Sequence, residues 1–312
     1  MSTDDRADAE YTLGRSEAVE LATAWASHRA ARIGVRILVL KGPLAHTQGI
    51  RAKRTSSDVD ILVEPGRSEA LISEFGLGGW HERFAPDIPW LIELHSTTLF
   101  HARWPIDIDV HHYWPGFLVD RQAAFETMWV DREQHELAGV SVFTPDALTA
   151  SLVLALHSLR RPASEDHAGD IPNLVAKLRR LSLDNLPALM TDRARLLGAT
   201  QTSRPFLVAL GADVAEELNP DDDLRLWKLN ALARGHTRAW AAAISNAPLR
   251  KKPVYLIRAV LPSPREMRGL HPELAPGITG LVRGYWRRLG SGGRELTKAA
   301  LQWARRSGRA DV

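Results

Sequence analysis

Two short segments, residues 57–63 and 106–112, contain alternating acidic and branched apolar side chains, at Asp58–Ile61 and at Ile106–Val110. In an extended chain, successive side chains point to opposite faces. Each segment is therefore predicted to be a β-strand with an acidic face and an aliphatic face. The aliphatic faces need a hydrophobic core, and the acidic faces need a partner for their charge.

The acidic faces hold Asp58 and Asp60 in the first segment, and Asp107, Asp109 and His111 in the second. Neighbouring carboxylates repel each other and lose hydration when they are packed, so a purely structural explanation must name a compensating group. A divalent cation is such a group, because magnesium takes oxygen ligands from one or two carboxylates and from substrate phosphates. This pattern favours phosphoryl or nucleotidyl transfer.

The rest of the first 120 residues is predicted to alternate helices with short strands. Hydrophobic spacing predicts helices over residues 16–32, 44–50 and 66–75, a strand over 37–40, and a hairpin of strands 90–100 and 105–113 around a turn at 101–104. Together with the Asp58–Asp60 strand, these segments predict a small mixed sheet.

Beyond about residue 120 strand signals nearly vanish, and the pattern becomes helical. Asp146 is a predicted N-cap for a helix over 147–160, and further helices are predicted near 171–180, 204–218, 224–245 and 294–306. The fold class is therefore α+β, with an α/β core over 1–125, a helical domain over 126–249 and a basic helical region over 250–312.

Composition excludes several kinds of chemistry. The chain has no cysteine, which excludes disulfides, zinc–thiolate sites and thiol catalysis. Residues 1–10 are polar and acidic, unlike a secretory signal, and the longest apolar run, near 147–156, is too short to cross a bilayer. There is no Walker loop, dinucleotide loop or nucleophile elbow. We therefore expect a cytoplasmic protein without a membrane span.

The charge of the chain is uneven. Residues 250–312 carry 14 lysines and arginines against 4 acidic residues, a balance of +10, so residues 1–249 carry −7 of the total +3. A basic tail can contact RNA, an anionic membrane or an acidic partner. A solvated helical face explains it more simply, because aromatic residues are sparse among its charges.

The order of the motifs resembles the DNA polymerase β-like nucleotidyltransferase superfamily, and within it a bacterial group of uncharacterised nucleotidyltransferases. The matching segments cover about residues 15–290 and are Leu38–Gly42, Arg54 followed by Asp58-Val59-Asp60, Asp109-Val110-His111, Asp146-Ala147-Leu148, His157, Asp170-Ile171, Leu261–Pro264 and Met267-Arg268. The resemblance implies a polymerase β-like core with a small mixed sheet, followed by an all-helical region.

The resemblance also implies a reaction. A magnesium-dependent enzyme, with two ions and with manganese as a substitute, would move an NMP unit from an NTP such as ATP to an acceptor hydroxyl by in-line attack. Asp58, Asp60 and Asp109 would hold the metals, and Asp109 would help to deprotonate the acceptor. Asp107 is the alternative to Asp109, which is preferred by its family position only.

Phosphate binding is predicted for Lys41, Gly42, Arg54 and Ser57. A lysine that ends an apolar strand is hard to explain structurally, because lysine is almost never buried unpaired. The wider superfamily carries Gly-Gly or Gly-Ser at this turn, whereas Pro43 here removes an amide donor. Lys41 would then supply charge in place of the missing hydroxyl, which leaves open whether a nucleotidyl group is transferred at all.

A substrate pocket is predicted from residues with weaker signals. Its candidates are Asp107, His111, Glu93, His95, His157 and Asp170. A strand histidine is as readily structural, and Glu93 and His95 are equally well explained by solvent exposure. His157 and Asp170 are interpreted as interhelical or pocket groups rather than metal ligands.

The expected partners are an NTP and an unidentified acceptor, a small molecule or peptide being favoured and RNA being an alternative through the basic tail. Two other functions stay open. One is a toxin-like transferase that acts on tRNA or protein, for which salt-sensitive RNA binding would be the sign. The other is a non-catalytic accessory protein of a biosynthetic pathway.

Overall fold

The computed structural model describes residues 13–83, 95–160, 169–232, 244, 248–260, 264, 267, 273–275 and 277–287. The chain divides into two compact units. The first comprises Met1–Arg83 and His95–Leu232, and the second comprises Phe84–Leu94 and Ala233–Val312. Each unit is described by itself.

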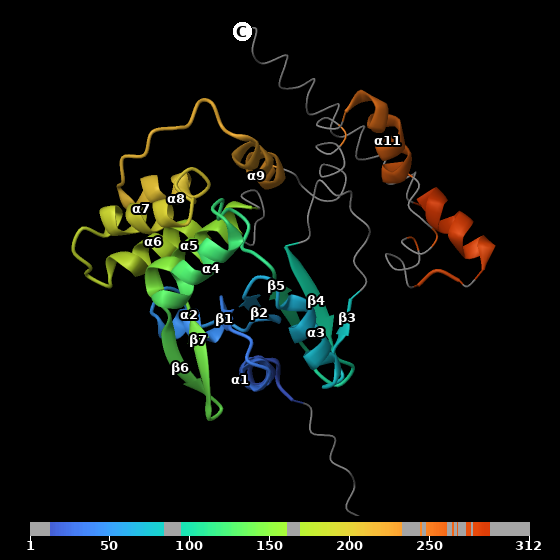
Figure 1. The fold of residues 1–312 in the computed structure, drawn as a ribbon, viewed down its shortest axis with the longest axis horizontal. Helices are drawn as coiled ribbons and strands as arrows, with labels where there is room; N and C mark the ends of the chain where they lie inside the picture. Colours follow the sequence, from blue (N-terminus) through green and yellow to red (C-terminus); the bar gives the residue numbers. More distant parts are fainter. Residues whose placement is uncertain are drawn as a thin grey trace, which may run out of the picture. The chain divides into compact units, whose positions relative to one another are not determined.

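A five-stranded mixed sheet forms the centre of the first unit (Figure 1). Its spatial order is β1 (Ile37–Val39), β2 (Asp58–Val63), β5 (Asp107–His111), β4 (Ser96–Phe100) and β3 (His81–Glu82). Strands β2 and β5 are parallel, and every other neighbouring pair is antiparallel. The predicted mixed sheet and the predicted β4–β5 hairpin are confirmed, and residues 90–94 of that prediction lie outside the described residues.

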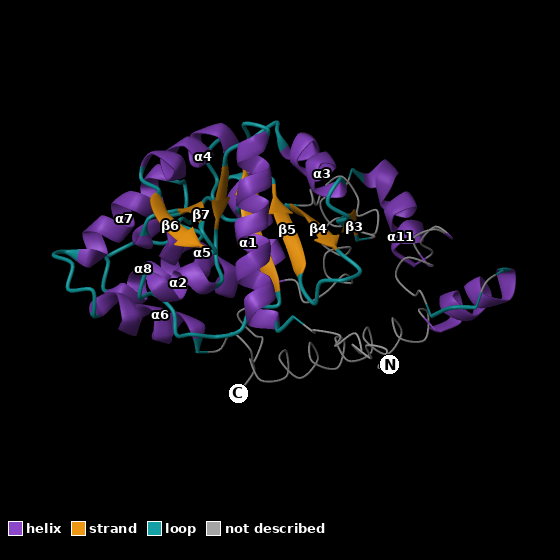
Figure 2. Ribbon diagram, turned by 90° about the horizontal axis from the view of Figure 1, so that it is seen from below, coloured by secondary structure: helices purple, strands orange, loops and turns teal. Residues whose placement is uncertain are grey.

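One face of the sheet is covered by α1 (Arg15–Arg32) and α3 (Ser68–Gly76), and Figure 2 shows α1 running across the strands. The apolar positions of the two acidic strands, Val59, Ile61, Ile108 and Val110, are buried in this layer. The alternation in the sequence therefore has the expected origin, since one face of each strand packs on the core and the other carries the carboxylates.

The opposite side of the unit is helical, and Figure 1 shows α4 to α8 gathered together there. The helices are α2 (Pro43–Thr47), α4 (Arg121–Val130), α5 (Ala147–Leu159), α6 (Asp170–Arg179), α7 (Leu186–Leu196), α8 (Arg204–Leu210) and α9 (Asp222–Leu232). Their core is continuous with Leu38, Leu40 and Leu62 of the sheet and with Trp114. The α+β fold class is thus confirmed.

A hairpin in the second half corrects the expectation that strands stop near residue 120. β6 (Glu133–Leu137) and β7 (Val140–Thr144) pair antiparallel around Ala138 and Gly139, whose φ angles are 48° and 74°. Two positive φ angles are typical of a tight two-residue hairpin turn. The signal was weak because β6 is mostly polar and the turn lacks the usual Asn-Gly pair.

Some helix boundaries also differ from the predictions. α8 ends at Leu210 rather than at 218, because Gly211 adopts a φ of 102° and stops the helix. Helices α4 and α7 were not predicted. The predicted helix at 294–306 lies outside the described residues, and so does the part of the 224–245 helix beyond Leu232, apart from residue 244.

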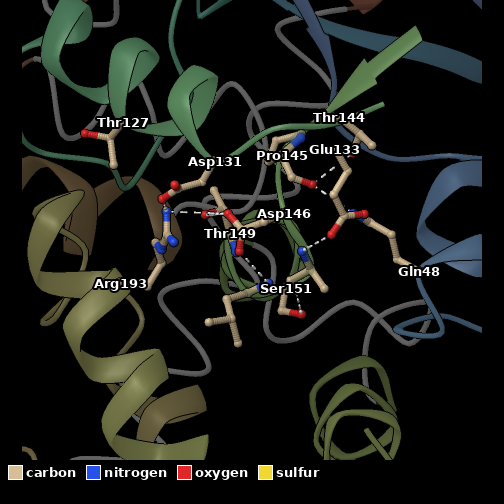
Figure 3. Close-up of polar contacts among 12 residues, drawn as sticks. Gln48, Thr127, Asp131, Glu133, Thr144, Pro145, Asp146, Thr149, Ser151 and Arg193 are labelled. Carbon is tan, nitrogen blue, oxygen red and sulfur yellow. Dashed lines mark hydrogen bonds and ion pairs between the residues drawn. The ribbon is translucent and has the colours of Figure 1, made fainter. Parts of the chain in front are cut away.

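A polar network holds the segment after α2 against the hairpin and the start of α5 (Figure 3). The Gln48 amide donates to Glu133 Oε2 at 2.9 Å and to the Pro145 carbonyl at 2.8 Å. The second oxygen of Glu133 accepts the Ala147 backbone N–H at 3.2 Å. Glu133 therefore links the residue after α2 to the start of α5 through hydrogen bonds.

The start of α5 is also fixed by Asp146, as predicted. Asp146 Oδ1 accepts the N–H groups of Leu148 and Thr149 at 3.0 and 3.3 Å, which is N-cap geometry. Arg193 of α7 lies 2.7 Å from Asp131 and 3.4 Å from Asp146 (Figure 3). The capping residue thus also ties α5 to α7.

The second unit is described only in part. It contains a short 3-10 helix (Leu249–Lys251), α11 (Lys252–Val260) and a helix over 278–287, where Gly284 lies close to Met267 and Leu274. Among the described residues, no helix is both long and apolar enough to span a membrane.

Candidate functional site

The carboxylates of β2 and β5 face each other in register. Asp58 pairs with Asp107, and Asp60 pairs with Asp109, along the parallel ladder. Residues directly opposite one another in a sheet project from the same face. The acidic faces that the sequence predicts are therefore a single acidic surface made by two adjacent strands.

Asp60 is the most buried of these carboxylates, with 4% of the residue exposed. Its Oδ2 lies 2.9 Å from Lys41 Nζ, and its Oδ1 lies 2.8 Å from His111 Nε2. Burial alone would raise the pKa of Asp60, but the Lys41 ammonium and the His111 hydrogen bond outweigh it and hold that pKa well below its usual range. Asp60 is therefore a permanent negative charge.

Asp109 lacks such compensation. Its Oδ1 accepts a hydrogen bond from Thr98 Oγ1 at 2.5 Å on the neighbouring strand β4. Burial raises the pKa of Asp109, the charges of Asp60 and Asp58 raise it further, and the Thr98 hydrogen bond counteracts them in part. A carboxylate in this position is a suitable ligand for a cation.

Asp60, Asp109 and His111 form a group whose ligand atoms all lie within 4.8 Å of one another. Two carboxylate oxygens are the ligands that magnesium prefers, whereas imidazole suits softer metals better. Among the described residues, the buried atoms His111 Nδ1 and Trp114 Nε1 have no hydrogen-bond partner. The two rings pack together with centroids 4.9 Å apart. The group thus fits a hard divalent ion through its carboxylates and keeps polar atoms available for a ligand.

The remaining acidic residues have different surroundings. Asp107 is held by Arg83 through two hydrogen bonds of 2.7 Å each, so its charge is already paired. Asp58 is half-buried, accepts from Ser56 Oγ at 3.1 Å and is not part of the group of three. Ser57 is exposed and precedes β2 directly.

Lys41 and Gly42 form the turn between β1 and α2. The Lys41 ammonium lies 3.3 Å from His157 Nδ1 and 5.3 Å from the centre of the Trp114 ring, in addition to its contact with Asp60. Gly42 has φ 79° and ψ −145°, a conformation that L side chains rarely adopt, and Pro43 begins α2. This backbone turn is what directs the lysine onto the acidic surface.

Of the residues predicted to form a substrate pocket, His95 lies beside Arg160 and His111. His95 Nε2 lies 3.2 Å from an Arg160 guanidinium nitrogen, and its ring lies 5.5 Å from that of His111. Burial, with the Arg160 charge adding to it, lowers the pKa of His95 to about 3. His95 is therefore neutral, and its main contact is with Arg160. Glu93 lies outside the described residues.

His157 and Asp170 line a cavity of about 330 Å³ on the helical side of the same unit. Asp170 accepts a hydrogen bond from Ser158 Oγ at 3.0 Å. The predicted Arg54 lies in this lining, together with Arg51, Lys177 and Arg180, which the sequence analysis did not single out. The signal that could have found them is the repeat of basic residues in the loop before β2 and on one side of α6.

The site and fold define an α+β protein with a carboxylate centre on one face of a mixed sheet. No family model matches the sequence, and no curated protein matches it. Eight chains of solved structures are similar, among them the following three. A nucleotidyltransferase-like antigenic protein from Paracoccidioides brasiliensis shares 13% identity over 64% of this chain and 95% of its own, with a TM-score of 0.37.

The other two are antibiotic-resistance proteins. The lincosamide antibiotic adenylyltransferase LnuA, with lincomycin bound, shares 18% identity over 50% of this chain and 94% of its own, with a TM-score of 0.34. The resistance factor ANT(2'')-Ia shares 12% identity over 60% of this chain and 97% of its own, with a TM-score of 0.37. At these values the likeness carries no conclusion about the activity of this chain.

Proposed function

We propose that the protein is a magnesium-dependent nucleotidyltransferase that moves an NMP unit from an NTP to a hydroxyl group of an acceptor. The observation that carries this proposal is the direct pairing of Asp60 with Asp109 on adjacent parallel strands, completed by His111.

The metal requirement follows from the charge of the site. Asp60 is charged, and Asp109 is a half-buried neighbour that accepts a hydrogen bond from the Thr98 hydroxyl, so a divalent cation would stabilise both. Asp60 and Asp109 would hold it, with Asp58 on the same face for a second ion. When bound, magnesium would supply positive charge at the reacting phosphate and promote ionisation of the acceptor hydroxyl.

The reaction needs one proton acceptor and one new bond. The acceptor oxygen bonds to the α-phosphorus of the NTP, the bond from that phosphorus to the β-phosphate oxygen breaks, and pyrophosphate leaves. Asp109, beside the cation, would take the hydroxyl proton. Lys41 would place positive charge beside the phosphates as a point charge. Arg54, predicted for the same role, lies in the lining of the cavity beside α6.

The accessory-protein alternative has one observation in its favour. The Lys41 ammonium already neutralises Asp60 at 2.9 Å, as it would in a site that binds no metal. The tRNA-modifying alternative depends on the basic tail, most of which lies outside the described residues. The expected cytoplasmic location and the two-ion stoichiometry stay predictions.

Calorimetric titration of Mg–ATP into wild type and into an Asp58→Ala/Asp60→Ala variant tests the nucleotide site. We expect binding by the wild type that the variant loses. Incubation with a small-molecule extract and ATP labelled at the α- or the γ-phosphate then separates the reactions. Label from the α-position alone on a new product supports nucleotidyl transfer, and label from the γ-position alone would replace it with phosphoryl transfer. No binding of any Mg–NTP by folded wild type would overturn the proposal.

A further inference from the structure

The cavity beside α6 has an excess of positive charge. Arg51 and Arg54 belong to the loop after α2, whereas Lys177 and Arg180 come from α6 and its C-cap. None of these four side chains forms an ion pair with any residue that the structure describes. Among the described residues of the cavity lining, Asp170 is the one carboxylate.

The positive charges of Arg51 and Arg54 repel each other, and this repulsion affects the pKa of Arg51. Burial lowers the pKa of Arg51, and the charge of Arg54 lowers it further, while Asp170, Asp60 and Asp58 act in the opposite direction. Arg51 is half-buried and Arg54 is exposed, and a bound anion would stabilise a half-buried guanidinium beside a second positive charge. The basic side of the cavity therefore matches an acidic group.

The rest of the lining is apolar or uncharged. Ile50, Leu154 and Leu174 are buried residues of the lining, and Asn173 adds an amide. A bare phosphate chain would place charged oxygens against these aliphatic side chains and lose hydration without compensation. A ligand that carries both a hydrocarbon portion and an acidic group matches both parts of the lining.

The cavity adjoins the carboxylate centre. His157 belongs to its wall, and His157 Nδ1 lies 3.3 Å from Lys41 Nζ, which in turn lies 2.9 Å from Asp60. One side chain therefore separates the cavity from the catalytic lysine. Asp60 and Asp109 do not line the cavity, so a molecule held there would have to extend past His157 to bring a hydroxyl group to them.

We propose that this cavity is the acceptor pocket, and that the acceptor is a small organic anion with a carboxylate or phosphate ester on a hydrocarbon body. This inference rests on the proposed nucleotidyl transfer and names its substrate class. A volume of about 330 Å³ is at the lower end for ligand sites, which run from roughly 300 to 1,000 Å³, so a small acceptor fits it. The acceptor hydroxyl attacks the α-phosphorus, as described above, and the acidic group serves only for recognition.

Ligand-detected NMR with a defined panel tests the inference. The probes are 3-phenylpropanoate and phenyl phosphate, each with a neutral partner of the same carbon skeleton (3-phenylpropanol and phenol), and tripolyphosphate as a carbon-free anion. The proteins are wild type, a Lys177→Gln/Arg180→Gln variant and an Arg179→Gln control. Arg179 lies on the same helix but bonds the Ala209 carbonyl and is not part of the cavity lining.

We expect wild type and Arg179→Gln to bind the organic anions, with the neutral partners bound at least about tenfold more weakly. The Lys177→Gln/Arg180→Gln variant should lose at least about tenfold for the anions, because charge-assisted hydrogen bonds are removed. Its Mg–ATP affinity should stay within about threefold of wild type.

Two results would overturn the inference. One is the absence of organic-anion binding at millimolar concentration by folded wild type. The other is a preference for tripolyphosphate together with an equal loss of Mg–ATP affinity in the double variant, which would assign the cavity to the nucleotide phosphates. Anion binding without any Mg–ATP binding would instead refute the proposed function and leave an organic-anion site.

Discussion

Asp60 of β2 and Asp109 of β5 lie directly opposite each other in a parallel ladder, yet different groups contact the two carboxylates. Asp60 contacts both Lys41 and His111, whereas Asp109 has the Thr98 hydroxyl. Two adjacent carboxylates with unequal compensation are expected where a cation completes the site.

Asp109 and Asp107 lie on the same face of β5, and their replacement should have unequal effects. We expect Asp109→Asn to weaken Mg–ATP binding and to lower transfer by about 10²–10⁴-fold, because a metal ligand and proton acceptor is removed. Asp107→Asn should change both by less than about threefold, because Arg83 already binds that carboxylate. Titration calorimetry and product labelling measure the two effects. Equal losses in both variants would contradict the assignment of Asp109.

The ion pair between Lys41 and Asp60 should make the two residues strongly coupled in stability. The Lys41 and Asp60 side chains are only 10% and 4% exposed, so removing either one leaves the charge of the other buried. Each of Lys41→Met and Asp60→Asn should lower the free energy of unfolding by about 3–5 kcal/mol.

The double variant should lose less than the sum of the single variants, by about 1–3 kcal/mol. Urea unfolding of all four proteins followed by circular dichroism gives the coupling energy. Additive losses would mean that the two side chains do not form the observed pair in solution.

Gly42 is expected to be required for its backbone conformation alone. Its φ is 79°, and an added Cβ would meet no atom within 4 Å. Gly42→Ala should therefore destabilise the protein by about 1–3 kcal/mol through backbone strain. It should also displace Lys41 and weaken Mg–ATP binding.

The matched control is Gly76→Ala at the end of α3, which also has open space and no positive φ. That change should be neutral or stabilising by up to about 1 kcal/mol, because alanine favours the helix. Thermal unfolding distinguishes the two. A neutral Gly42→Ala would show that the turn is not strained.

The His95 imidazole should stay neutral at pH values far below the ordinary pKa of histidine. Its pKa in the folded protein is about 3, below the ordinary value of 6.5, because burial and Arg160 disfavour the imidazolium. The unfolded chain therefore binds a proton first, and the free energy of unfolding should fall as pH decreases from about 6.5 toward 3.

NMR titration of the imidazole carbon resonance tests this directly. No titration of His95 is expected between pH 8 and 5, whereas a midpoint near 6.5 would contradict it. His95→Gln should reduce the pH dependence of stability over the same range, since glutamine does not titrate.

Much of the secondary structure was predictable from the pattern of residues along the chain. The alternation in residues 57–63 and 106–112 predicted two half-buried strands, because strand side chains repeat every two residues. Asp146 predicted the start of α5 because its side chain caps the helix locally. The β6–β7 hairpin was missed, since its polar strand has no apolar face to reveal it.

The sequence by itself thus determined which residues form the acidic surface and which turn carries Lys41. Only the tertiary structure showed that Arg83, which follows β3, binds the Asp107 carboxylate, whereas Asp109 accepts a hydrogen bond from Thr98. It also brought His111 onto Asp60, and placed Lys177 and Arg180 beside Arg51 across more than 120 residues of sequence. Side-chain period is a local property of the backbone, whereas the pairing of charges depends on strand register and helix packing, which distant parts of the chain fix together.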